Sequence, residues 1–251
     1  MKRAARERVV HALCAIALPL ALMEPAAAAQ VSLGSATATF CQINFPIADA
    51  LDGDFNASTG WAVDPQQGND QTAVVKAGAD IGGLDATRLA FRLNMSWGAS
   101  HTIGRFRLSA TTSPRTTYGL GAACGDATPG GTAVWNVLSP QQLLSQNGQT
   151  LTVQPDGSVL ASGGNPLSDE VAFVATTSLR GITGFRLEVL ADPSFPVNGP
   201  GRASNGNFVL TELLLDARTL PSIPTLETWA LALTALMLML SAVGLLRRRR
   251  G

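Results

Sequence analysis

The middle of this 251-residue chain consists of short apolar runs with a period near two, and this pattern restricts the fold most. The alternation is strict in Arg105-Phe106-Arg107-Leu108-Ser109, which predicts a strand with Phe106 and Leu108 facing a core and the arginines facing out. Turn-forming residues separate the runs, and only 140–145 has a helical pattern. The expected strands are 31–40, 71–77, 87–95, 104–112, 150–154, 158–161, 171–177, 182–190 and 207–215. Strands at this spacing predict an all-β antiparallel sandwich.

The end of the chain is an apolar segment followed by a basic cluster. No charged residue occurs from 228 to 246, and the four arginines 247–250 follow directly. A helix over 228–246 is about as long as the hydrocarbon core of a bilayer is thick. The arginines favour a transmembrane helix that ends in the cytoplasm, because positive residues stay on that side. The alternative is a buried C-terminal helix, which would have to accommodate those arginines near a core.

The start of the chain has the three parts of an export signal. A basic beginning is followed by an apolar stretch over 9–23 and by four small residues over 26–29. This order predicts a signal peptide over 1–29, removed after Ala29. The alternative is an uncleaved N-terminal anchor. Export places the body in the periplasm or outside the cell.

The body between the two ends is acidic. The ends, 1–29 and 221–251, hold eight of the 18 basic residues and three of the 18 acidic residues of the chain. The body 30–220 therefore keeps ten basic and 15 acidic residues, a net charge of −5. Nucleic-acid binding requires a basic surface that this composition does not supply. We expect no nucleic-acid partner and no adsorption to anionic lipid.

Two cysteines, Cys41 and Cys124, remain in the body when Cys14 leaves with the signal peptide. Disulfides form in the oxidising compartments that exported proteins reach. We therefore expect Cys41 and Cys124 to be bonded, with two separate buried thiols as the alternative. The cysteines are too few for a structural zinc site.

The tail contains a recognisable short motif. Ile223-Pro224-Thr225-Leu226 precedes Trp229 and the apolar helix. This arrangement resembles the IPTL-type variant of the PEP-CTERM sorting signals of Gram-negative bacteria, although Ala230 stands where that family usually has glycine. The resemblance implies a sorting signal over 221–251, including Trp229. It also implies cleavage by an exosortase-type transpeptidase, a body first held at the inner membrane, and a final place at the cell surface or outside the cell.

Two blocks of the body carry a second resemblance. One block runs from 48 to 62, contains Asp52-Gly53-Asp54 and ends at Trp61-Ala62, and 101–109 continues it. The other covers 151–163, 182–188, 199–202 and 205–212. Both resemble the non-catalytic β segments attached to planctomycete c-type cytochromes, and the first resembles the opening of galactose-binding-like (discoidin-type) jelly rolls. The resemblance implies a galactose-binding-like jelly-roll sandwich over 30–220, as one composite domain or two half-modules. No Cys-x-x-Cys-His motif is present, so haem does not carry over.

The same resemblance implies a metal site. Galactose-binding-like domains often hold a structural calcium between this loop and a glutamate of the last strand. The matching positions here are Asp52, Asp54 and Glu212. The alternative is that the aspartates are ordinary turn residues, which favour such loops.

The chemistry expected of the body is binding rather than catalysis. Trp61, Trp97 and Trp135, with Tyr118, offer a surface on which a sugar ring can stack, and the alternative is that these aromatics are core residues. His101 is the one histidine in the body, and no Gly-x-Ser-x-Gly elbow accompanies it. We expect a carbohydrate-binding or glycoconjugate-binding module without enzymatic activity. A structural component of the cell surface or biofilm matrix is the alternative, and a hydrolase using His101 is a third reading.

Overall fold

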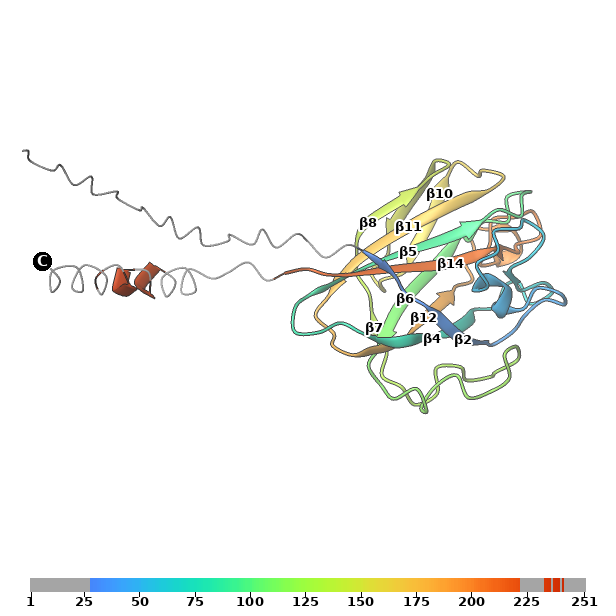
Figure 1. Ribbon diagram of the computed structural model, residues 1–251. Coiled ribbons are helices and arrows are strands. Elements are labelled where there is room, and N and C mark those ends of the chain that lie inside the picture. The colour runs from blue at the N-terminus through green and yellow to red at the C-terminus, as the bar shows by residue number, and fades with distance from the viewer. Residues whose placement is uncertain (1–27, 222–232, 236, 240, 242–251) are drawn as a thin grey trace, which may run out of the picture.

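The computed structural model describes residues 28–221, 233–235, 237–239 and 241, and the body is built from two antiparallel sheets (Figure 1). Sheet A has the order β1–β14–β5–β11–β8, with strands Ala29–Gln30, Glu212–Thr219, Thr87–Met95, Asp169–Thr177 and Pro140–Ser145. Sheet B has the order β2–β4–β12–β6–β10–β9, with strands Leu33–Ala38, Gln71–Ile81, Ile182–Val189, Arg105–Thr111, Val159–Gly163 and Gln149–Val153. The loops contain the short strands β3 (Trp61–Ala62), β7 (Asn136–Val137) and β13 (Val209–Leu210) and the 3-10 turns η1 (Ile47–Ala50) and η2 (Pro196–Asn198). The predicted all-β sandwich is confirmed.

The core lies between the two sheets, where alternating apolar side chains meet. Strand β5 alternates buried and half-buried residues along its whole length, as expected for a strand with one face on a core. Phe91 on β5 packs edge to face against Phe185 of sheet B at 5.2 Å between ring centroids. Phe106, predicted to face inward, is 2% exposed and packs against Phe173 of sheet A. Large aromatic side chains therefore join the sheets at the centre of the sandwich.

The outer face of sheet B is partly covered. Arg107 of β6 faces out as predicted, and forms an ion pair with Glu188 of β12 at 2.8 Å. Farther along β6 the alternation stops, because Ser109 and Ala110 are both fully buried. The segment 112–135 crosses the sheet there and places the fully buried ring of Tyr118 over it. A covering loop thus explains why strict alternation ends in the middle of a strand.

Residues 140–145, which have a helical pattern in the sequence, form strand β8 instead. This strand is an edge of sheet A and pairs with β11 in antiparallel register, from Val171↔Ser145 to Ala175↔Pro140. A bulge between Val174 and Ala175 adjusts the register. The expected helical turn is therefore wrong. Pairing along an exposed edge outweighs the weak local preference of a six-residue segment.

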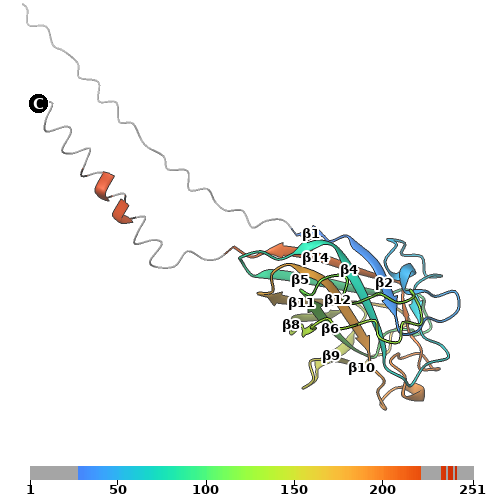
Figure 2. The ribbon, with the colours of Figure 1, turned by 90° about the horizontal axis from the view of Figure 1, so that it is seen from below.

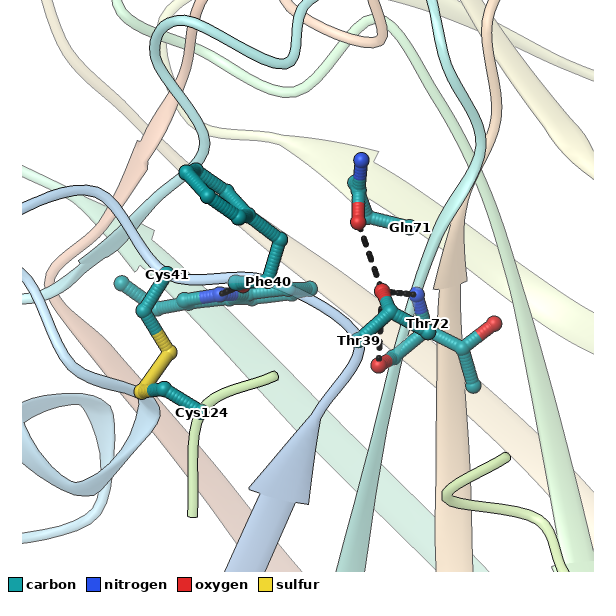
Figure 3. The surroundings of a disulfide bond; sticks show 7 residues. Thr39, Phe40, Cys41, Gln71, Thr72 and Cys124 are labelled. Atoms are coloured by element: carbon teal, nitrogen blue, oxygen red, sulfur yellow. Dashed lines mark hydrogen bonds between the residues drawn. A yellow bond between two sulfur atoms is a disulfide. The ribbon is translucent and has the colours of Figure 1, made fainter. Parts of the chain in front are cut away.

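A disulfide holds the covering segment 112–135 to the end of β2. Cys41 and Cys124 are bonded, with Cα atoms 5.4 Å apart (Figure 3). The backbone supports the same contact, because Ala38 N–H donates to the Ala123 carbonyl at 2.9 Å and its own carbonyl accepts from Gly125 at 3.0 Å. Beside the disulfide, Thr39 Oγ1 donates to Gln71 Oε1 at 2.6 Å (Figure 3). The disulfide therefore fixes the segment that covers sheet B to the end of strand β2.

The two ends of the sandwich are different. Strand β1 pairs with the last half of β14, so the chain enters and leaves the sandwich side by side (Figures 1 and 2). Strands β5 and β14 are antiparallel, with Asn94 opposite Glu212 and Thr87 opposite Thr219. The first residue of β14 therefore lies about 25 Å along the strand from the point where the tail begins. Long loops occupy the end of the sandwich at which Asn94 and Glu212 lie, and we call this end the loop end.

The predicted signal peptide and most of the predicted tail lie outside the described residues. This applies to 1–27 of the signal peptide, to the sorting motif with Ile223, Pro224, Thr225, Leu226 and Trp229, and to much of 228–246. Residues 233–235, 237–239 and 241 are helical. Within the described residues, no helix reaches the length and apolar character needed to cross a membrane.

Candidate functional site

The loop end is a set of segments that hold one another in place. The segment after β5 forms a bridge with the loop before β13, through the pair Ile103↔Gly201. Gly104 N–H donates to the Pro200 carbonyl at 2.7 Å, and Val209 N–H donates to the His101 carbonyl at 3.0 Å. These contacts join loops that are about 100 residues apart in sequence. These hydrogen bonds between loops therefore fix the positions of the side chains that the loops carry.

Trp97 is an aromatic side chain that these loops present to solvent. It is 37% exposed, and its ring packs edge to face against Phe45, with centroids 5.0 Å apart. His101 lies on another side of the ring at 6.4 Å. The turn that joins Trp97 to His101 contains two non-glycine residues in the left-handed region, Ala99 at φ 48° and Ser100 at φ 59°. Such conformations persist only where the surroundings impose them, and they are frequent at ligand-binding sites.

Trp61 is a core residue, which corrects its assignment as a ligand-binding platform. Its side chain is 0% exposed, and Nε1–H donates to the Phe40 carbonyl at 2.9 Å. The ring packs edge to face on Phe208 at 5.2 Å. Strand β3, which contains Trp61, pairs with β13 and carries the ring beneath the loops. A buried tryptophan with its polar atom satisfied stabilises the loop end but does not contact a ligand.

Trp135 lies elsewhere, on the covered outer face of sheet B. It is half-buried, and its Nε1–H donates to the Gly130 carbonyl at 3.1 Å. Its ring packs against Tyr118 at 5.3 Å and against the guanidinium of Arg186 at 5.3 Å. Trp135 thus fastens segment 112–135 to the sheet. The three tryptophans do not form one surface, and Trp97 alone keeps the expected character of a platform.

Glu212 begins strand β14 and is a buried carboxylate beside the 52–54 loop. It is 2% exposed, and its Oε2 accepts the Gly53 N–H at 3.2 Å. Burial raises the pKa of Glu212 to about 7, and the negative charges of Asp52 and Asp54 act in the same direction. A pocket of about 220 Å³ opens beside it, lined in part by Asp52 and Gly53. A carboxylate in this position is destabilised by its own charge unless a cation is near.

The aspartates of the loop turn partly toward their own backbone. Asp52 Oδ1 accepts the Asp54 N–H at 2.8 Å, and Asp54 Oδ1 accepts the Asn56 N–H at 2.9 Å. Within the part of the chain that the structure describes, no three aspartate, glutamate, histidine or cysteine side chains gather as metal ligands do. The expected set of Asp52, Asp54 and Glu212 is therefore brought to one place without converging as three carboxylates. The remaining oxygens there belong to the loop backbone.

His101 has no arrangement typical of a general base. Its Nδ1 lies 3.0 Å from the Gly98 carbonyl, and the neighbouring Ser100 hydroxyl donates to the Asn165 carbonyl at 3.4 Å. In a nucleophile–base pair, the hydroxyl would instead donate to the imidazole. The contacts in the described residues place His101 as a support of the loop.

Two residues of the loop end could not be foreseen as site residues. Phe45, whose ring packs against Trp97, is one of several apolar residues in its loop and carries no motif. Arg202 is 8% exposed and donates to the Gly163 carbonyl at 3.0 Å. The only signal for Arg202 is an arginine inside the run 199–202, whose glycines predict a loop and not a buried cation.

Comparison with known proteins identifies the tail. Residues 221–250 match the family model of the IPTL-CTERM motif, as the resemblance of the tail predicts. The chain thus carries an IPTL-CTERM sorting signal. No protein with a curated description matches the chain in sequence.

Several solved structures are similar to the body. A family 32 CBM from Clostridium perfringens NanJ, solved in complex with galactose, is 12% identical, covering 76% of this chain and 99% of that one, with a TM-score of 0.41. CBM32-3 from a family 31 glycoside hydrolase of Clostridium perfringens is 14% identical, covering 73% and 90%, with a TM-score of 0.41. A structure of the Streptococcus pneumoniae beta-galactosidase BgaA is 13% identical, covering 75% and 98%, with a TM-score of 0.43.

Proposed function

We propose that this chain is an exported, surface-sorted and non-catalytic binding module, whose body binds a carbohydrate or glycoconjugate through the loop end of its sandwich. The observation that carries the binding part is Trp97, an exposed aromatic ring on a firmly held loop. Sugar-binding sites require a flat apolar surface that is in place before the ligand arrives. The backbone hydrogen bonds of the loops around Trp97 hold its ring in place before a ligand binds.

The proposal includes the assignment of the sandwich to the galactose-binding-like jelly rolls, on the sequence blocks quoted above. It also includes a structural calcium at Glu212 and the 52–54 loop. The buried charge of Glu212, which has no cationic partner among the described residues, supports this site. Glu212 and oxygens of the loop would hold the ion, and the ion would join the last strand to the loop. Hard oxygen donors are the ligands that calcium takes.

Sorting and processing form the other part of the proposal. The 228–246 helix holds the body on the periplasmic side of the inner membrane, and an exosortase-type transpeptidase cleaves near Thr225. Pro224 disfavours helix at the residue before it, which keeps the motif extended for a peptidase. The body then reaches the cell surface or the medium. Strand β14 begins at the loop end with Glu212 and runs toward the tail, so the loop end and the start of the tail lie at opposite ends of this strand.

A glycan array tests the binding part. The full chain in detergent, the Trp97→Ala variant and the Trp97→Tyr variant are applied to the same array. We expect the wild-type protein and the tyrosine variant to bind the same glycans, and the alanine variant to lose them. Equal binding by Trp97→Ala would remove the proposed site. A folded wild-type protein that binds no glycan would contradict the binding function and would favour the structural matrix role.

A further inference from the structure

A second pocket at the loop end contains a buried arginine, and we call it the Arg202 pocket. It has a volume of about 380 Å³ and lies between β10 and the segment that leads into η2. Phe195 and Pro196 form an apolar wall, and Ser162 and Asn165 supply polar groups. Arg202 is the only charged residue among those that line the pocket. The size and the mixture of surfaces fit a small-molecule site.

Arg202 brings a positive charge into this pocket without a carboxylate in contact. Its Nη1 donates to Gln149 Oε1 and to the Gly164 carbonyl, and its Nη2 donates to the Gly163 carbonyl. All three acceptors are neutral. Asp169 lies beyond Gln149, whose Nε2 donates to it at 2.6 Å. Within the described residues Arg202 therefore has no ion-pair partner, although buried charges are normally paired.

Two of the five N–H donors of Arg202 make no hydrogen bond within the described residues. A guanidinium has five N–H groups, and the three hydrogen bonds above use three. Arg186 and Arg218 each bury an Nε that has no partner, whereas the Nε of Arg202 is not among the atoms buried in this way. Arg202 also lines the pocket. Burial lowers the pKa of Arg202, and Asp169 only partly opposes this effect. The lack of an ion pair among the described residues and the lowered pKa both indicate that Arg202 is a buried cation without an anion in contact.

The nearby carboxylates do not supply that anion. Asp192 precedes the pocket segment and is paired with Arg105 at 3.2 Å. Asp169 is 3% exposed, and its oxygens accept from Ser145, Asn147 N–H and Gln149. Gly104 allows the Phe195 ring to pack directly against its backbone, because a Cβ there would lie 2.4 Å from the ring. The pocket is therefore both electropositive and shaped before a ligand binds.

We infer that the Arg202 pocket binds the carboxylate of an acidic sugar. A carboxylate matches the two free donors of the guanidinium, which favour such anions in charge-assisted pairs. The C–H face of a sugar ring fits against Phe195 and Pro196, and its hydroxyls meet Ser162 and Asn165. This inference rests on the proposed carbohydrate-binding function and names its ligand class. It adds a binding site distinct from Trp97.

Paired probes test the inference by titration calorimetry on the full chain in detergent. The probes are methyl glycosides of glucuronic, galacturonic and N-acetylneuraminic acid, each compared with its methyl ester, in which the charge is absent. We expect at least one acid to bind at least tenfold more tightly than its ester, since a charge-assisted hydrogen bond contributes about that much. Equal affinity of every acid and its ester would overturn the inference. Acetate that competes as well as the sugar acids would reduce the site to a plain anion site and would overturn the sugar part.

Matched variants locate the binding without touching Arg202, whose replacement would disturb the loop at 163–164. Ser162 is exposed in the pocket, so Ser162→Asp adds a competing charge and Ser162→Asn changes the same position without charge. We expect both variants to melt near the wild-type temperature, and the aspartate variant to bind the acid at least tenfold more weakly than the asparagine variant does. Equal affinities of the two variants would contradict the site.

The Trp97→Ala variant separates this inference from the proposed function. Acid binding that survives in Trp97→Ala and is lost in Ser162→Asp supports the Arg202 pocket. Binding that depends on Trp97, with no preference for acid over ester, would retain the proposed function and refute the inference. Absence of binding to all probes would refute the inference, and the glycan array would still decide the function.

Discussion

The buried carboxylate of Glu212 makes the stability of the folded body depend on pH, and replacing it with glutamine isolates this effect. Glu212 is 2% exposed, and its pKa is raised from 4.5 to about 7, chiefly by burial. Glutamine keeps an oxygen that can accept the Gly53 N–H, and it carries no charge. The Glu212→Gln variant therefore removes the penalty of burying a charge and leaves the packing nearly unchanged.

The direction of the effect follows from proton binding. The folded protein holds the Glu212 proton more tightly than the unfolded chain does. The stabilising contribution of the protonated form is complete below about pH 4.5, and it is lost as the pH rises toward 7, because unfolding then releases a proton. Burial also raises the pKa of Asp49, with a smaller addition from Asp52, and this contributes with the same sign.

The magnitude is set by the difference between the two pKa values. A shift from 4.5 to about 7, at roughly 1.4 kcal/mol per unit, amounts to about 3 kcal/mol at pH 8. For a body of this size, that corresponds to a melting temperature change of roughly 6–12 °C. We expect Glu212→Gln to be more stable than the wild type by about this amount at pH 8 in chelator, and similar to it at pH 5.

Thermal melting at four pH values between 5 and 8, in chelator and in millimolar calcium, measures both effects. Calcium that binds only the folded state raises the wild-type melting temperature at pH 8. The Glu212→Gln variant should respond little to calcium, and Glu170→Gln, which replaces a half-buried hydrogen-bonded glutamate, should behave as the wild type. A wild-type stability that does not fall between pH 5 and 8 in chelator would refute the pKa reasoning. An unchanged melting temperature with calcium would refute the calcium site alone.

Three further predictions concern other parts of the chain. Trp61→Ala should cost about 3–5 kcal/mol of stability in denaturant unfolding, and Trp97→Ala much less, because only Trp61 is fully buried; equal losses would place both rings in the core. Cys41→Ser should cost about 4–5 kcal/mol, since the bond to Cys124 closes a loop with a sequence separation of 83, and alkylation of exported protein without reductant should label neither thiol. Pro224→Ala should slow release of the body in the native host, followed on blots with tags before 221 and after 250, and unchanged processing would contradict the role of the extended motif.

The sheets could be predicted because their signal lies in single strands. Phe106 and Leu108 alternate with arginines, and the structure buries both apolar residues as this pattern requires. The pairing of Cys41 with Cys124 followed from counting cysteines after export. Strand β8 was not predictable, since its conformation depends on β11, a partner from a different part of the chain. Local pattern therefore determines the faces of strands, and tertiary pairing decides where the pattern is weak.

The site could be predicted only in part, because burial at the loop end is a property of several loops together. Trp61 and Trp97 look alike as single aromatics next to a glycine, yet one is 0% and the other 37% exposed. The difference arises because β3 pairs with β13 and carries Trp61 inward, while the turn after Trp97 is held outward by the bridge at Ile103. The buried charge of Arg202 has the same origin, since two of its three acceptors are backbone carbonyls whose position no sequence pattern reports.

Processing at either end of the chain can leave the sandwich intact, because most contacts of the terminal strands lie inside the two proposed cleavage points. A cut after Ala29 still leaves Gln30 opposite Asp216 and the Val31 N–H bonded to the Leu215 carbonyl at 2.8 Å. At the other end, the Leu220 N–H donates to the Ala86 carbonyl at 2.8 Å, and the sorting motif begins only after this bond. The proposed removal of the signal peptide and release from the tail would therefore leave the loop end unaltered. The proposed binding site and the sorting signal consequently lie toward opposite ends of strand β14, so each can be changed without altering the other.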